Sequence, residues 1–167
     1  MRGSLAVCTV IGGLILVSSS VSAVDLPKRK AGLWEVTLQM AGGKMPPQTV
    51  KFCTDAATDE ALFQLGTNTA DQMCSRKDIS RNGDVVTMDT ECKMGESKMT
   101  SHAVMTFTGD TAYKTAIQSH MDPPMMGRSE TSMTQDARWT GACPADMQPG
   151  DMMMPNGIKM NLKSKGP

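Results

Sequence analysis

The sequence contains few aromatic residues. Its 167 residues include only two Trp, one Tyr and three Phe, against 17 Met. A folded core must therefore be filled largely by aliphatic and methionine side chains. Because methionine is unbranched and flexible, it fills irregular gaps and also suits adaptable binding surfaces.

An excess of either charge is also absent, since 17 basic residues stand against 17 acidic ones. Removing Arg2 with the signal peptide described below changes the net charge only to about −1. Nucleic acids and anionic lipids are bound mainly through basic surfaces. The composition therefore predicts that neither is a partner.

Motifs of the common enzyme classes are missing. The sequence has no G-x-S-x-G, no H-E-x-x-H, no glycine-rich phosphate loop and no Cys-x-x-Cys. Its only histidines are His102 and His120, and the hairpin pairing described below predicts a separation of about 13 Å between them. A shared nucleophile and base are not indicated. We therefore predict a protein that is not an enzyme and carries no cofactor.

The N-terminus lacks a hydrophobic run long enough to cross a membrane, which takes roughly 18 residues or more. Arg2 is instead followed by a shorter apolar stretch, residues 5–17, a serine cluster and the small residues Val21-Ser22-Ala23. This order is typical of a secretory signal peptide. We predict a signal peptide over residues 1–23, cleavage after Ala23, a periplasmic or secreted location, and no stable membrane anchor.

Four cysteines remain after that cleavage: Cys53, Cys74, Cys92 and Cys143. An even number in an exported chain favours two disulfides. The alternative is a four-thiolate zinc site, but the paired Cys-x-x-Cys knuckles of such sites are absent. Four cysteines allow three connectivities, and the sequence leaves the choice open.

Alternating side chains predict a strand over residues 33–40, LWEVTLQM, with Trp34 and Leu38 on the buried face. A Gly/Pro loop follows, and then a short second strand that ends at Cys53. Thr54 is a candidate N-cap for a helix that runs to Gly66, which is placed to end it. This is the single helix expected in the mature domain.

The Asn82-Gly83 pair predicts a hairpin with a two-residue turn. That turn sets Ile79 opposite Val86 and Cys74 opposite Glu91. A direct bridge between Cys74 and Cys92 would instead need a three-residue loop or a bulge. Both arrangements stay open, and we pair Cys74 with Cys92 as the working hypothesis.

A second hairpin is expected around a three-residue loop, residues 108–110. It places Met105 and Tyr113 on the buried face, sets His102 opposite Ala116, and gives polar side chains, including both histidines, to the other face. A further strand is expected over residues 129–139. Residues 146–167 are rich in Met, Pro and Gly and are predicted to be a mostly disordered tail.

The predicted fold is therefore mainly β, in an α+β arrangement. It consists of a single antiparallel sheet of about six to seven strands, strongly curved or partly closed, with one short helix. Residues 24–145 form the β-rich domain.

Several segments in this order resemble a known family. They are GLWEVTLQM, the strand end QTVKFCT with a helix after it, the hairpin between Cys74 and Cys92, the turn from Phe107 to Tyr113, and RWTGACP. Over about residues 29–145 the chain is similar to the bacterial exported family catalogued as domain of unknown function 3617. The resemblance implies a small, exported, β-rich protein and no assigned activity or catalytic residue.

The segment HMDPPMMG, residues 120–127, raises the question of a soft-metal site. Thioether sulfur binds Cu(I) without deprotonation and survives an oxidising compartment. The alternative function is therefore a periplasmic Cu(I) or Ag(I) handling protein with ligands His120, Met121, Met125 and Met126. Against it, methionines are spread along the whole chain and lack a regular Met-x-x-Met spacing, which favours packing.

The function that the sequence favours is non-catalytic binding in the cell envelope. A curved sheet with few aromatic and many methionine side chains would offer a shallow apolar concavity. The expected lining residues are Trp34, Leu38, Met105 and Tyr113. The expected partner is a small apolar ligand or an envelope protein.

Overall fold

The computed structural model describes residues 24, 26–42 and 46–162. The predicted signal peptide, residues 1–23, lies outside the described residues. Among the residues described, no helix is long and apolar enough to cross a membrane.

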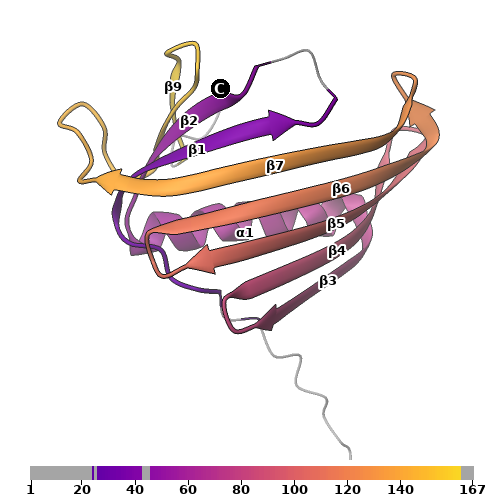
Figure 1. The fold of residues 1–167 in the computed structure, drawn as a ribbon, viewed down its shortest axis with the longest axis horizontal. Coiled ribbons are helices and arrows are strands. Elements are labelled where there is room, and N and C mark those ends of the chain that lie inside the picture. The colour runs from indigo at the N-terminus through magenta and orange to yellow at the C-terminus, as the bar shows by residue number, and fades with distance from the viewer. Residues whose placement is uncertain (1–23, 25, 43–45, 163–167) are drawn as a thin grey trace, which may run out of the picture.

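The fold is one open antiparallel sheet with a helix on one face (Figure 1). The elements are β1 Gly32–Met40, β2 Gln48–Thr54, α1 Ala56–Met73, β3 Cys74–Asn82, β4 Val85–Met94, β5 Ser97–Thr108, β6 Ala112–Met125, β7 Arg128–Gly141, β8 Asp151–Met153 and β9 Lys159–Asn161. The strand order is β3-β4-β5-β6-β7-β1-β2-β8-β9. The predicted mainly β class with a single antiparallel sheet and one helix is confirmed, but the sheet of the described residues is open, not partly closed, and has nine strands, not six to seven.

Two of the additional strands come from the segment that was predicted to be disordered. β8 pairs with β2, and β9 pairs with β8. The Asp151 carboxylate holds this hairpin, because it accepts hydrogen bonds from the Gln148 backbone N–H at 3.0 Å and from the Asn161 amide at 2.6 Å. These two bonds lower the pKa of Asp151. The prediction of a disordered tail is wrong for residues 146–162, because tertiary hydrogen bonds order a segment whose composition alone suggests disorder.

Helix α1 is longer than predicted. Asp55, not Thr54, is its N-cap, and a capping box joins Asp55 to Thr58. The helix continues through Gly66 and ends at Met73. A helical glycine costs only about 1 kcal/mol relative to alanine, so the flanking turns carry the helix past it.

Both predicted hairpins exist, with registers displaced by two residues. The first turn is Gly83-Asp84, which sets Ile79 opposite Met88 instead of Val86, and a bulge beyond Arg76 brings Cys74 opposite Cys92. In the second hairpin the three-residue loop is 109–111, so that Phe107 faces Tyr113. A shift of two residues keeps every side chain on its predicted face, whereas a shift of one would reverse it.

The contacts of Arg29 show which face of the sheet carries the helix. Its guanidinium contacts the Asp59 carboxylate of α1 and donates to the Tyr113 hydroxyl of β6 at 3.2 Å. It also lies 5.8 Å from the Trp34 ring centroid and 5.5 Å from that of Tyr113. We call the face that carries α1 and Tyr113 the inner face, and the opposite one the outer face.

A buried cluster closes one end of the inner face. It comprises Trp34, Val36, Val86, Phe107, Tyr113 and Ala137. Gly32 permits the close strand contact beside it: its φ is +133°, and an added Cβ would lie 2.2 Å from the Gly141 carbonyl oxygen. This end of the molecule is packed tightly.

Two disulfides flank the helix. Cys53, just before α1, bonds Cys143, and Cys74, directly after α1, bonds Cys92. Two disulfides are compatible with an exported protein, and they settle the connectivity that the sequence left open.

Candidate functional site

The inner face carries an apolar row that crosses six neighbouring strands. Consecutive cross-strand partners form it: Met40, Met133, Ile117, Ala103, Met88 and Ile79. Only Ala103 is buried, Met88 is 36% exposed, and the other four are partly buried. Helix α1 lies behind β5 and β6 on this face in Figure 1. The helix therefore leaves this apolar row incompletely covered.

A mixed row lies next to the apolar row, toward the buried cluster. It comprises Leu38, Gln135, Thr115, Met105, Val86 and Arg81. Thr115 is 5% exposed, and its hydroxyl has no hydrogen-bond partner among the described residues. An unsatisfied buried polar group costs about 1–3 kcal/mol, so this hydroxyl is a position where a bound group would be stabilising.

The four residues proposed as a ligand-binding set divide between these regions. Trp34 and Tyr113 are only 1% and 7% exposed and belong to the buried cluster. Burial also raises the pKa of the Tyr113 hydroxyl, although Arg29 opposes this effect. Leu38 and Met105 are partly buried in the mixed row, beside the apolar row. The second pair, and not the first, borders the accessible apolar surface.

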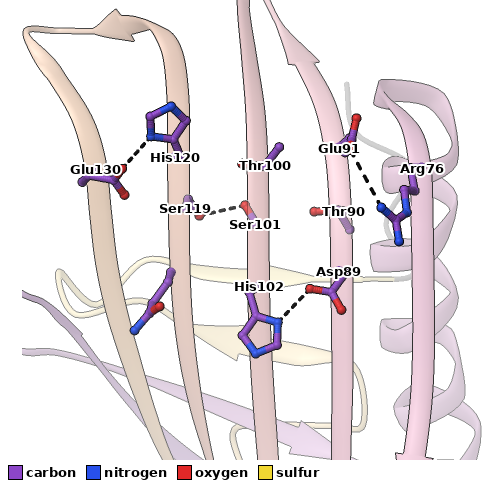
Figure 2. Close-up of a pocket in the computed structure, with 11 residues that line it drawn as sticks. Arg76, Asp89, Thr90, Glu91, Thr100, Ser101, His102, Ser119, His120 and Glu130 are labelled. Carbon is purple, nitrogen blue, oxygen red and sulfur yellow. Dashed lines mark hydrogen bonds and ion pairs between the residues drawn. The ribbon is translucent and has the colours of Figure 1, made fainter.

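The outer face has a polar depression of about 390 Å³ over β3 to β7 (Figure 2). His102 Nδ1 lies 2.7 Å from Asp89, and His120 Nδ1 lies 2.5 Å from Glu130. The observed register places His120 opposite Thr100, two residues from His102. The predicted separation of 13 Å was wrong, because such diagonal neighbours lie about 7–8 Å apart.

Charges of both signs in this depression are already paired. Glu91 lies 2.7 Å from Lys98, and this hydrogen bond lowers the pKa of Glu91. Arg76 lies 2.5 Å from Asp78, which raises the pKa of the guanidinium. The depression therefore presents little uncompensated charge to a ligand.

The serines of the depression are not placed for nucleophilic catalysis. Ser101 and Ser119 hydrogen-bond each other at 2.7 Å. Ser101 precedes His102 on β5, and successive side chains of a strand point to opposite faces. The serine hydroxyls and the imidazoles thus belong to different faces, and this arrangement does not form a Ser-His-Asp triad.

The four proposed soft-metal ligands do not share one face of the sheet. His120 and Met121 are neighbours on β6, so their side chains point to opposite faces, and Met121 is buried. Met125 ends the strand, and Met126 is 96% exposed in the following turn. Within the described residues no cluster of three His, Cys, Asp or Glu side chains could hold a metal ion.

A family model described as "Protein of unknown function (DUF3617)" matches residues 29–143. The chain belongs to this family. The match confirms the predicted resemblance and covers the sheet from β1 through β7, together with both disulfides. No curated protein and no solved structure matches the chain. Family membership therefore assigns the domain and leaves its activity to be inferred from the site.

The apolar row was not identified from the sequence. Alternation indicates the face on which Met88, Ile117 or Met133 lies, but only the strand order and register show that they adjoin. The detectable signal was that, in β1, β5, β6 and β7, an apolar position such as Met40 follows at even spacing from the aromatic residue of the strand.

Proposed function

We propose that this protein is a non-catalytic binding module of the cell envelope that holds a small apolar ligand between α1 and the apolar row. The proposal rests on one observation: the apolar row is continuous across six strands, and the helix on the same face covers only part of it. Ligand sites are mostly apolar, with a few polar groups placed among them. The apolar row and the adjacent Thr115 hydroxyl fit that description.

The attachment of α1 supports ligand entry on this side. Its N-terminal end is tied through Asp59 to Arg29, and its C-terminal end through Asp71 to Lys77 of β3. The buried cluster is built from strand residues without the helix. Leu65, within α1, is 55% exposed. Because both of these ion pairs lie near the ends of the helix, we expect the stretch between them to move more readily than the ends.

A small ligand is favoured over a folded partner because of this helix. Helix α1, whose two ends are flanked by disulfides, partly covers the apolar row (Figure 1) and would restrict the approach of a second protein to it. The flexible side chains of Met40, Met88 and Met133 would adapt to ligands of different shape. The polar depression of the outer face is lined by polar and charged side chains, and its charges are paired.

The test is a fluorescence titration of the oxidised chain from Val24 with the apolar probe N-phenyl-1-naphthylamine. Changing Met88 and Met133 together to Gln should weaken binding about tenfold or more, because a buried methionine contributes about 1.5–3 kcal/mol. Met126→Gln is the matched control, since that side chain is almost fully exposed. Absence of probe binding, or equal binding by all variants, would refute the proposal.

A further inference from the structure

The Thr115 hydroxyl belongs to the mixed row of the inner face, beside the apolar row. It belongs to a side chain that is 5% exposed, and it has no hydrogen-bond partner among the described residues. Buried hydroxyls in folded proteins are normally satisfied, so an exception calls for a specific explanation. Ordinary core packing would be served as well by valine, which has nearly the same shape.

The position of Thr115 relates it to the ligand surface. On β6 it lies two residues from Ile117 of the apolar row, about 7 Å along the strand on the same face. Its cross-strand neighbours are Met105 on β5 and Gln135 on β7. Gln135 is partly exposed and offers an amide that both donates and accepts. A ligand on the apolar row would thus meet two neutral polar groups at its edge.

Charge in this region restricts the kind of group that fits. Two cations of the inner face already have carboxylate partners: Arg29 contacts Asp59, and Lys77 contacts Asp71. Arg81 lies on β3, three strands from β6 in the same row, or about 14 Å away. Burying an ionised carboxylate beside Thr115 would therefore leave it without a counter-charge, which is strongly unfavourable.

We infer that the ligand is a neutral amphiphile, whose apolar body lies on the apolar row and whose uncharged hydroxyl, ester or amide group hydrogen-bonds Thr115. This inference rests on the proposed function and adds the chemical class of the ligand. Thr115 is then a specificity-determining residue. Its hydroxyl distinguishes a polar-ended ligand from a pure hydrocarbon of the same length.

The experiment compares three competitors of equal chain length for displacement of the bound probe: 1-dodecanol, dodecanoate and dodecane. The oxidised wild-type chain should bind dodecanol about five- to tenfold more tightly than dodecane, the range expected for one net hydrogen bond. Dodecanoate should bind more weakly than dodecanol. In Thr115→Val the preference for dodecanol over dodecane should fall to about one, while dodecane affinity stays the same.

Two controls separate the possible outcomes. Thr115→Ser keeps a hydroxyl and should retain the preference, and Thr134→Val makes the same substitution on the exposed outer face of β7 and should change nothing. If the probe binds but Thr115→Val keeps the dodecanol preference, or if dodecanoate binds best, the inference is wrong and the proposed function stands. If the probe does not bind the wild-type chain, the proposed function itself fails.

Discussion

Removing the two disulfides separately should destabilise the fold by different amounts. The bridge from Cys53 to Cys143 closes a loop with a sequence separation of 90 residues, and that from Cys74 to Cys92 one of 18. A bridge lowers the chain entropy of the unfolded state, more strongly for a longer loop. The loop lengths give about 4.6 kcal/mol for the first and about 3.2 kcal/mol for the second.

Packing acts in the same direction. Cys53 is fully buried, so replacing it with alanine also removes contacts within the core. The loss from the Cys53→Ala, Cys143→Ala double variant should therefore exceed that from Cys74→Ala, Cys92→Ala by at least about 1.4 kcal/mol, the difference between the two loop terms.

Urea unfolding at equilibrium measures both losses, with the slope of each transition checked for two-state behaviour. Treating the wild-type chain with reductant should lower its midpoint below that of either variant. If the shorter loop proved the more costly to open, the loop-entropy reasoning would be refuted. If neither variant lost stability, the bridges would not be contributing to the fold.

Four further outcomes are expected. Arg29→Met should cost about 2–3 kcal/mol in urea unfolding, because it removes a charged hydrogen bond from a partly buried carboxylate; an unchanged midpoint would contradict this. Gly32→Ala should cost about 2 kcal/mol or more, since φ is +133° and the added Cβ meets a carbonyl oxygen, whereas normal stability would disprove the close contact. Because the pKa of Asp151 is lowered in the folded state, its contribution is present above its ordinary pKa and is lost as pH falls through the folded value. Asp151→Asn should therefore reduce stability at neutral pH and flatten its decline in acid, and parallel pH profiles would argue against it. In an anaerobic Cu(I) titration against a competing chelator, the wild-type chain and the Met125→Leu, Met126→Leu variant should behave alike, and tight binding lost in the variant would restore the metal hypothesis.

Local chemistry predicted most of the individual elements. Alternation placed Trp34 on the buried face of β1, and the outer face of the second hairpin was correctly expected to carry both histidines. Pairing arithmetic left a three-residue loop or a bulge as the two ways to a Cys74–Cys92 bridge, and the structure has the bulge. Each inference depended only on neighbours within one strand or hairpin.

Long-range interactions decided the rest. The β8–β9 hairpin depends on Asp151 and on pairing with β2, about a hundred residues earlier in the chain, which composition does not encode. Trp34 and Tyr113 were expected, together with Leu38 and Met105, to line an apolar concavity. The structure uses them to close the core instead, since Arg29 and Asp59 seal that end. The apolar row became visible only once the register had joined six strands.

The structure shows where the few aromatic residues are used. Five of the six aromatic side chains belong to the buried cluster or pack against it, namely Trp34, Phe52, Phe107, Tyr113 and Trp139. They are stiff, and they close one end of the inner face around Arg29. The apolar row beyond them contains no aromatic residue, and three of its six members are methionine. The same sheet thus has a rigid end that maintains the fold and a methionine-rich end where we propose that the ligand binds, so substitutions in the cluster should alter stability first and those in the row should alter binding first.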